Sequence, residues 1–357
     1  MINTQHTPRP HDPIGTKLSP ADDWILLNDW LPPQTGVAPK VRIGRHWINV
    51  LWILPIGFVL AVIGVAVAQA LREIPAVQDL LVRYPGVPPT ARAVADGFPA
   101  WLRVQHFLNL LFMAFIIRSG IQVLADHPRL YWKRDCTPGT EWFRFQRPVP
   151  KGRIWTAKDD AVTIPRWLGI PGIRHSIGLA RWWHFSFGLL WIINGIILYA
   201  LLFWTNQWQR LVPTTWDVFP NAVSTALQYL SLTFPADESW TRYNSLQQLT
   251  YFITVFIAAP TSILTGFMQG PAISNRLGWF GKALNRQRAR SIHFLALWWF
   301  LFFILIHVTL VFITGARANL NMMFAGVQDG VGSWCAIFVP AIALVALTWW
   351  LASPFTI

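Results

Sequence analysis

Long apolar runs alternate with polar connections along the chain. A helix needs about 20 apolar residues to cross a hydrocarbon core about 30 Å thick. Six segments of the 357-residue sequence meet this requirement: 47–70, 104–124, 182–204, 249–270, 292–315 and 331–351. Among them, only the second carries a fixed charge, Arg118. The pattern therefore predicts an all-α integral membrane protein with six transmembrane helices.

Composition supports the same class. Charged residues make up 13% of the chain, whereas soluble domains average about 25%. The 22 tryptophans are typical of a protein that meets two membrane–water interfaces, where indole rings accumulate. The net charge of +13 would also suit a nucleic-acid partner, but the basic residues cluster in the connections between apolar segments. We therefore expect a lipid membrane as the partner and no nucleic acid.

The basic residues also predict an orientation. Alternate connections lie on opposite sides of the membrane: 1–45, 125–180, 271–291 and the C-terminus on one side, and 72–103, 205–248 and 316–330 on the other. The first set carries 20 Lys and Arg and the second carries 7. Because the positive side is cytoplasmic, we expect a multi-pass membrane protein with both termini in the cytoplasm.

This reading divides the chain into four parts. They are a polar cytoplasmic segment (1–45), an extra transmembrane helix (46–71), a four-helix core (100–315) and a C-terminal transmembrane helix (331–351). Within the core, the cytoplasmic loop 125–180 is long enough to dock a partner. The outer loop 205–248 contains WDVFPNAVSTALQYLSLTF, whose helical apolar spacing predicts a helix lying on the membrane surface.

Four histidines fall within or at the start of these spans. An ionisable side chain inside a membrane is a functional hypothesis by default, because burying it in hydrocarbon costs free energy. His293 and His307 share one segment and are fourteen residues apart. This spacing leaves the two rings about 40° apart around the helix and about 21 Å apart along it. They are too far apart to bind one ion, so each needs a partner on another helix.

Partners exist at matching depths. His184 begins a span on the same side as His293, and His106 begins a span on the side where His307 lies. The sequence therefore predicts an inner pair, His184 with His293, and an outer pair, His106 with His307. Two imidazoles from facing helices are typical axial ligands of a b-type haem. His46, at the start of the first span, is the main rival for the inner position.

Other residues fit a haem site less specifically. Arginines at or inside the span ends are candidates for haem propionates or, alternatively, for lipid headgroups: Arg103, Arg118, Arg181 and Arg290. Arg118 lies deepest, which favours a specific anionic partner. Small residues that let a flat macrocycle approach, or that only allow close helix packing, are Ser119, Gly120, Ser186, Gly188, Gly195 and Gly266.

Three motifs together resemble a known family. RVQHFLNLLFMAFIIRSG, RWWHFSFG and the histidines fourteen residues apart are similar to the core of two-haem cytochrome b subunits of bacterial membrane oxidoreductases. That family serves nickel–iron hydrogenases, formate dehydrogenases and thiosulfate reductases, and the resemblance implies the plasma (inner) membrane of a bacterium. The resemblance covers residues 100–315 and implies the same two histidine pairs. The extra helix 46–71, with the N-terminus inside, would invert the core relative to the formate dehydrogenase arrangement.

The resemblance also implies a function. It implies two b haems, electron exchange with a quinone, and a separate catalytic subunit of molybdenum or nickel–iron type. The chain itself would be an electron-transfer subunit rather than a stand-alone catalyst. One alternative is a self-contained two-haem reductase with a soluble cytoplasmic electron donor. Another is a proton-relaying transporter, which would need acidic residues that the spans lack.

Overall fold

The computed structural model describes residues 38–87, 95–145, 160–162, 177–235, 239–270, 273, 276–328 and 334–351. Most of the segment 1–45 and much of the loop 125–180 lie outside these ranges, so what was predicted for them stays a prediction. Within these ranges, five helices are long and apolar enough to cross a membrane. The predicted all-α membrane fold is confirmed.

The membrane-length helices match the first five predicted segments. They are α2 (Ile53–Arg72) after the short helix η1 (Val50–Trp52), α4 (Ala100–Asp126), α6 (Ile177–Trp204), a continuous run of α8 (Ser245–Phe252), η3 (Ile253–Ala258) and α9 (Ala259–Met268), and α12 (Arg286–Ile313). The sixth segment corresponds to α14 (Cys335–Leu351), an apolar helix of 17 residues. The count of six spans stays a prediction.

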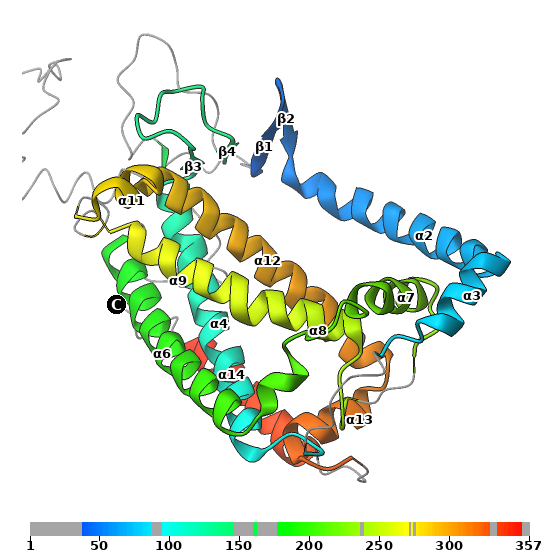
Figure 1. Cartoon of the computed structure of the whole chain (residues 1–357). Coiled ribbons are helices and arrows are strands. Elements are labelled where there is room, and N and C mark those ends of the chain that lie inside the picture. The colour runs from blue at the N-terminus through cyan, green and yellow to red at the C-terminus, as the bar shows by residue number, and fades with distance from the viewer. Residues whose placement is uncertain are drawn as a thin grey trace, which may run out of the picture.

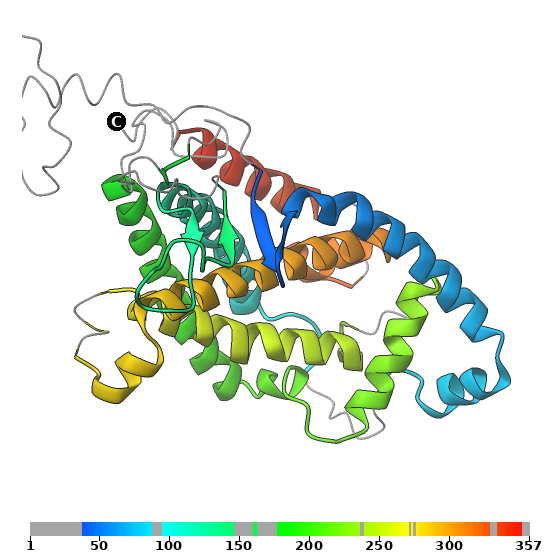
Figure 2. The ribbon, with the colours of Figure 1, turned by 90° about the horizontal axis from the view of Figure 1, so that it is seen from above.

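Two helix pairs form the core. α4 packs along α6, and α9 packs along α12, so that the four helices lie side by side in both views (Figures 1 and 2). Midway along the bundle, Met113, Ala258, Ala296 and Phe300 form a buried apolar cluster. α2 diverges from this bundle and meets α7 (Val218–Leu230) near its far end.

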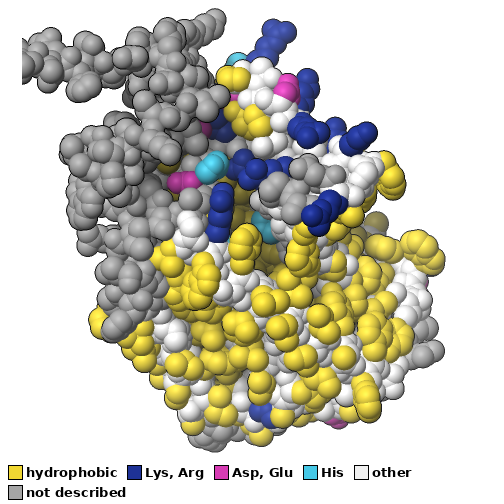
Figure 3. Space-filling model, turned by 90° about the vertical axis from the view of Figure 1, so that its left-hand side faces the viewer, with side chains coloured by type: hydrophobic (Ala, Val, Ile, Leu, Met, Phe, Trp, Pro, Cys, Tyr) yellow, Lys and Arg dark blue, Asp and Glu magenta, His cyan; other side chains and the backbone are white. Residues whose placement is uncertain are grey.

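The outward faces of the helices are apolar. Phe58 on α2 is 72% exposed, and Phe185 on α6 is 66% exposed. Figure 3 shows hydrophobic side chains covering most of one face, with Lys and Arg gathered at one end. Such a surface is far larger than the apolar patches that soluble monomers expose, and it suits contact with lipid. The chain is therefore a multi-pass membrane protein.

A π-helical stretch precedes Pro260 in the fourth span. Proline lacks an N–H and disrupts a regular helix, and η3 is where the hydrogen-bond pattern changes. The Tyr199 hydroxyl donates to the carbonyl of Val255, within η3. Thr254 accepts a hydrogen bond from the Trp299 indole at 3.1 Å. Side chains of α6 and α12 therefore bind the altered segment and hold it in the bundle.

A small antiparallel sheet lies where α4 ends and α12 begins (Figure 1). Its strand order is β2-β1-β4-β3, with β1 (Lys40–Ile43), β2 (His46–Asn49), β3 (Arg129–Leu130) and β4 (Phe143–Arg144). The sequence pattern did not predict this sheet, and the first span was predicted to begin at residue 47. Residues 40–49 instead form a hairpin, turning at Gly44 with φ +61°. We call residues 40–49, 129–145 and 160–162 the sheet cap.

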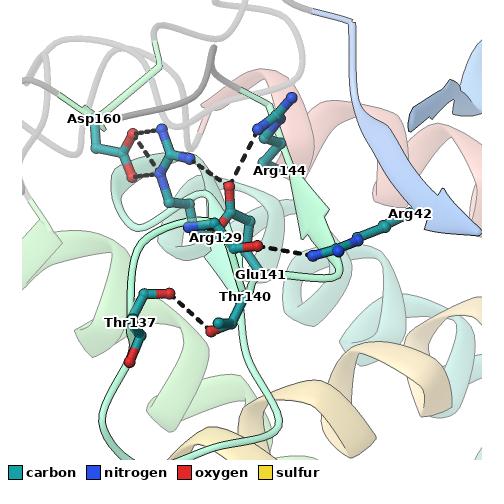
Figure 4. A network of polar contacts seen from close by, with 8 residues as sticks. Arg42, Arg129, Thr137, Thr140, Glu141, Arg144 and Asp160 are labelled. Carbon is teal, nitrogen blue, oxygen red and sulfur yellow. Dashed lines mark hydrogen bonds and ion pairs between the residues drawn. The ribbon is translucent and has the colours of Figure 1, made fainter. Parts of the chain in front are cut away.

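Buried ion pairs hold the sheet cap together (Figure 4). Glu141 is wholly buried and accepts from Arg129 and Arg144, each at 3.1 Å. Arg129 also bonds both carboxylate oxygens of Asp160, at 2.7–2.9 Å. Burial alone would lower the pKa of Arg129, but the hydrogen bond and charge of Asp160, with Glu141, raise it. The described part of the loop 125–180 is thus folded against the bundle.

Shorter elements connect the spans. They are α3 (Pro75–Arg83), η2 (Gln207–Arg210), α7, α11 (Gly278–Ala283), α13 (Ala316–Leu320) and η4 (Asn321–Ala325). α7 falls within the stretch for which a surface helix was predicted. Its Asn221 side chain is buried and accepts from the Gly86 N–H at 2.9 Å, while Val223 is 61% exposed. Its polar face meets protein and its apolar face points outward, as expected of a helix at a lipid surface.

Candidate functional site

α12 supplies one histidine at each of two levels. The helix is capped by Asn285, whose side chain accepts from the backbone N–H groups of Gln287 and Arg288. His293 meets His184 of α6, with ring centres 6.1 Å apart. His307 meets His106 of α4, with ring centres 6.3 Å apart. The structure thus brings together both pairs that spacing and depth predicted, and we call them the inner pair and the outer pair.

The rival ligand lies elsewhere. His46 is exposed and belongs to β2 in the sheet cap. His127 follows α4, and its Nδ1 lies 2.8 Å from a carboxylate oxygen of Asp126. His6, His11 and His175 fall outside the described residues.

The separation of each pair suits a shared iron. A metal–imidazole bond is about 2 Å long, and a ring nitrogen lies roughly 1 Å from its ring centre. Two imidazoles that bind one iron from opposite sides therefore have ring centres about 6 Å apart. Among the described residues no three of His, Cys, Asp or Glu gather at a possible metal site. A haem suits a site of only two side chains, because its macrocycle supplies the remaining ligands.

The inner pair has its Nδ1 atoms fixed by the neighbouring helices. His184 Nδ1 lies 3.1 Å from the carbonyl oxygen of Ile116 on α4. His293 Nδ1 lies 3.0 Å from the carbonyl oxygen of Ser262 on α9. A carbonyl only accepts, so each Nδ1 carries the proton and each Nε2 keeps a free lone pair. This is the tautomer that binds a metal through Nε2.

The outer pair has different surroundings. Nδ1 of His106 is buried and has no hydrogen-bond partner among the described residues. His307 stacks on Phe303, with ring centres 5.5 Å apart and planes 6° apart. The Tyr251 ring meets His307 edge-on at 6.1 Å. Aromatic carbon therefore dominates this level.

The candidate arginines lie in different environments. Arg103 Nη1 donates to the Phe324 carbonyl at 3.2 Å, one turn before His106. Arg118 is wholly buried, donates to the Trp349 carbonyl at 2.9 Å and lies 4.3 Å from the centre of the Trp349 ring. Arg181 is exposed, and Arg290 donates to the His127 carbonyl at 2.7 Å. Arg118 thus links α4 to α14, a contact that the sequence did not reveal.

Two of the candidate glycines face the inner pair. A Cβ on Gly120 would lie 3.3 Å from His184 Cε1, and one on Gly266 would lie 3.5 Å from His293 Cε1. Cβ atoms on Gly188 and Gly195 would meet nothing within 4 Å. Thr265, which precedes Gly266, was not singled out from the sequence, although its Oγ1 lies 3.1 Å from His293 Nδ1. The recurrence of a hydroxyl residue before glycine in RSG and LTG was the available signal.

An apolar helical bundle that brings histidines from facing helices together defines a class: membrane-bound b-type cytochromes. The comparisons specify it further. The sequence profile described as prokaryotic cytochrome b561 matches residues 97–326. The chain belongs to this family of membrane cytochromes, whose b-type haem serves electron transfer across the membrane. The predicted family is confirmed.

One relative is a protein of Azospira oryzae provisionally named protein-methionine-sulfoxide reductase subunit YedZ1. It is 26% identical over 218 residues, which are 60% of this chain and 88% of that protein. No solved structure matches the chain significantly. The family match begins after α2 and α3 and ends before α14, so it covers the four-helix core.

Proposed function

We propose that this protein carries electrons across the membrane through two bis-histidine haems, between a quinone pool and a partner oxidoreductase subunit. The observation that carries the proposal is the pairing of His184 with His293 and of His106 with His307, at 6.1 and 6.3 Å between ring centres. When bound, the two b haems supply reversible one-electron chemistry at two depths of the bilayer.

The protein's own residues hold and separate the two sites. The four imidazoles would hold the two haems, with the inner pair oriented through the carbonyls of Ile116 and Ser262. The fourteen residues from His293 to His307 place the levels about 21 Å apart along α12. Buried Phe300 and Met113 fill the space between these levels and exclude water from it. Arg103 and Arg118 lie near the outer and inner levels, where a guanidinium can neutralise a propionate.

The proposed orientation follows from charge. The sheet cap exposes Lys40, Arg42, Lys133 and Arg134, and by the positive-inside rule this end faces the cytoplasm. The inner pair then lies on the cytoplasmic side and the outer pair on the opposite side of a bacterial plasma membrane. Both termini are cytoplasmic in this arrangement, with α14 as the sixth span.

The partners are inferred from likeness. The resemblance to cytochrome b subunits of hydrogenases and formate dehydrogenases supports a quinone and a catalytic subunit of nickel–iron or molybdenum type. The relative named as a methionine-sulfoxide reductase subunit also supports a separate catalytic subunit. Reduction of the purified protein by a soluble quinol, such as duroquinol, tests the quinone. Failure of duroquinol to reduce a protein that dithionite reduces would remove the quinone from the proposal.

The central test is haem quantitation with a reduced-minus-oxidised visible spectrum of the purified protein. We expect two b haems per chain, and a protein without haem bands would overturn the proposal. His293→Ala and His307→Ala should each remove a different haem. His46→Ala is the matched control, because His46 is exposed on β2, and it should retain both haems.

A second candidate function is a self-contained reductase that takes electrons from a soluble cytoplasmic donor. The observation that favours it is an aromatic contact on the sheet cap. Trp132 is 41% exposed beside Lys133 and Arg134, and it stacks on Trp142 at 5.6 Å between ring centres. Trp142 in turn contacts Phe294, next to His293. Co-purification of a cofactor-bearing subunit from gently solubilised membranes would favour the first function, and its absence would favour the second.

A further inference from the structure

We propose that two hydroxyl–glycine pairs, Ser119–Gly120 on α4 and Thr265–Gly266 on α9, are positioning residues that set the inner haem to a lower reduction potential than the outer haem. This inference rests on the proposed function, since it requires a haem at each histidine pair. It adds an order of potentials and hence a direction for electron flow.

The two pairs are built in the same way. They end the sequences FIIRSG (115–120) and TSILTG (261–266). Each hydroxyl donates at 2.7 Å to the carbonyl four residues earlier, of Phe115 or Thr261. The carbonyl three residues earlier, of Ile116 or Ser262, is the one that faces a histidine Nδ1. Two helices from separate parts of the chain thus present the same acceptor geometry.

Each inner Nδ1 therefore has a second acceptor. Ser119 Oγ lies 3.2 Å from His184 Nδ1, and Thr265 Oγ1 lies 3.1 Å from His293 Nδ1. Because each hydroxyl proton is directed to its own helix, the oxygen lone pairs are available to the imidazole N–H. An N–H that donates to both a carbonyl and a hydroxyl is polarised more strongly than an N–H that donates to the carbonyl alone.

Such polarisation acts on the iron through the ring. When a histidine binds a metal through one ring nitrogen, a hydrogen bond donated by the N–H of the other ring nitrogen makes the imidazole a more basic ligand. A more basic imidazole stabilises the ferric state over the ferrous state, because the ferric iron carries the higher positive charge. Two histidines with two acceptors each therefore lower the reduction potential at the inner level.

The glycines let the rings reach these acceptors. At 3.3 Å, a Cβ on Gly120 would press on His184 Cε1, and the ring would have to move away from the α4 backbone. A Cβ on Gly266 would lie 3.5 Å from His293 Cε1, an ordinary van der Waals contact, so the space beside His293 is less tight than the space beside His184. The ring edges can therefore lie against the helix that supplies the carbonyl and the hydroxyl.

Among the residues that the structure describes, no hydroxyl–glycine pair contacts the outer histidines in this way. His106 Nδ1 has no hydrogen-bond partner among the described residues, and His307 lies against the rings of Phe303 and Tyr251. An imidazole without a polarised N–H is a weaker donor to ferric iron. The outer haem then has the higher potential, and transfer from the inner to the outer level is downhill.

A potentiometric titration of the purified full-length protein tests this order. His307→Ala keeps the inner haem and His293→Ala keeps the outer haem, so these variants assign the two potentials. Ser119→Ala and Thr265→Val each remove one hydroxyl acceptor at nearly constant shape. We expect each to raise the inner potential, and the double variant to raise it further, while the outer potential stays unchanged. Thr265→Ser restores the hydroxyl and should titrate like the unaltered protein.

The outcomes separate this inference from the proposed function. A protein with no haem, or with one, refutes the two-haem function itself. Two haems with the inner potential equal to or above the outer one overturn the order of potentials. Two haems whose inner potential is the same in Ser119→Ala, Thr265→Val and the unaltered protein overturn the role of the hydroxyls. If one variant loses the inner haem, the other still decides, because the two hydroxyls lie on different helices.

Discussion

The indole Nε1 of Trp142 lies 2.8 Å from the hydroxyl oxygen of Ser291. Ser291 is wholly buried two residues before His293, and its own hydroxyl donates to the Tyr131 carbonyl at 2.7 Å. One hydroxyl therefore connects two positions of the 129–145 segment of the sheet cap to the start of α12. The cap and the inner histidine pair form one packed unit.

Ser291→Ala should loosen this unit. The substitution leaves the Trp142 indole N–H and the Tyr131 carbonyl without their partner, at a cost of about 1–3 kcal/mol for a buried polar group. We expect a lower thermal midpoint and faster protease cleavage within 129–145. Thr309→Ala is the control on the same helix, because the Thr309 hydroxyl is exposed and bonds within its own turn. Equal stability of the two variants would contradict the role given to Ser291.

The proposed orientation predicts which positions react from outside. In a chain with Cys136 and Cys335 replaced by serine, Asp217→Cys should react with a membrane-impermeant maleimide on intact spheroplasts. Lys133→Cys should react only after the membrane is permeabilised. Both side chains are exposed, so accessibility within the protein does not distinguish them. The reverse labelling pattern would invert the orientation and place the inner pair on the outer side.

Tyr131 predicts a loss of stability at high pH. Burial, together with the charge of Glu141, raises the pKa of its phenol to about 12, whereas an unfolded chain has a tyrosine pKa of about 10. Because the pKa of Tyr131 is higher in the folded protein than in the unfolded chain, its contribution to the free energy of unfolding is fully present below about pH 10. That contribution is lost as the pH rises through about 12. Thermal midpoints measured across this range should fall less for Tyr131→Phe than for the unaltered protein. Parallel curves would show that Tyr131 is not responsible.

Two glycine substitutions test whether Gly120 makes room for the inner haem site or only allows close packing of helices. Gly120→Ala places a methyl group 3.3 Å from His184 Cε1, so we expect a several-fold weaker hold on the inner haem or its loss. Gly57→Ala on α2, outside the four-helix core, meets nothing within 4 Å and should leave both haems in place, because alanine favours a helix over glycine. The ratio of haem to protein after detergent washing measures both effects. An inner haem held equally by the two variants would rule out a special role for Gly120.

The sequence predicted the spans and the histidine pairing well, because both depend on regular helical geometry. The length of an apolar segment identifies a span, and the rise and rotation per helical residue predict how His293 and His307 lie relative to each other. The partners then followed from depth alone. The ends of the spans were less predictable: α4 extends to Asp126, and the first span begins after a strand rather than at residue 47.

The missed features depend on contacts between distant segments. β1 pairs with β4, about a hundred residues away in the chain, and the two-residue strands carry too little pattern to be recognised. Arg118 was expected to have an anionic partner, and its contact with Trp349 requires knowing where α14 lies. The acceptors of the histidine N–H groups include backbone carbonyls, which no sequence motif displays directly.

A single helix carries one histidine of each pair, and this makes the length of α12 between His293 and His307 a fixed quantity. Insertion of one residue there would rotate everything beyond it by about 100° and shift it by about 1.5 Å. His307 would then turn away from His106 while His293 kept its partner. The apolar residues between these two histidines can be exchanged for others of similar size, but their number cannot change without separating one of the two pairs; in the proposed function, that would disconnect the two sides of the membrane.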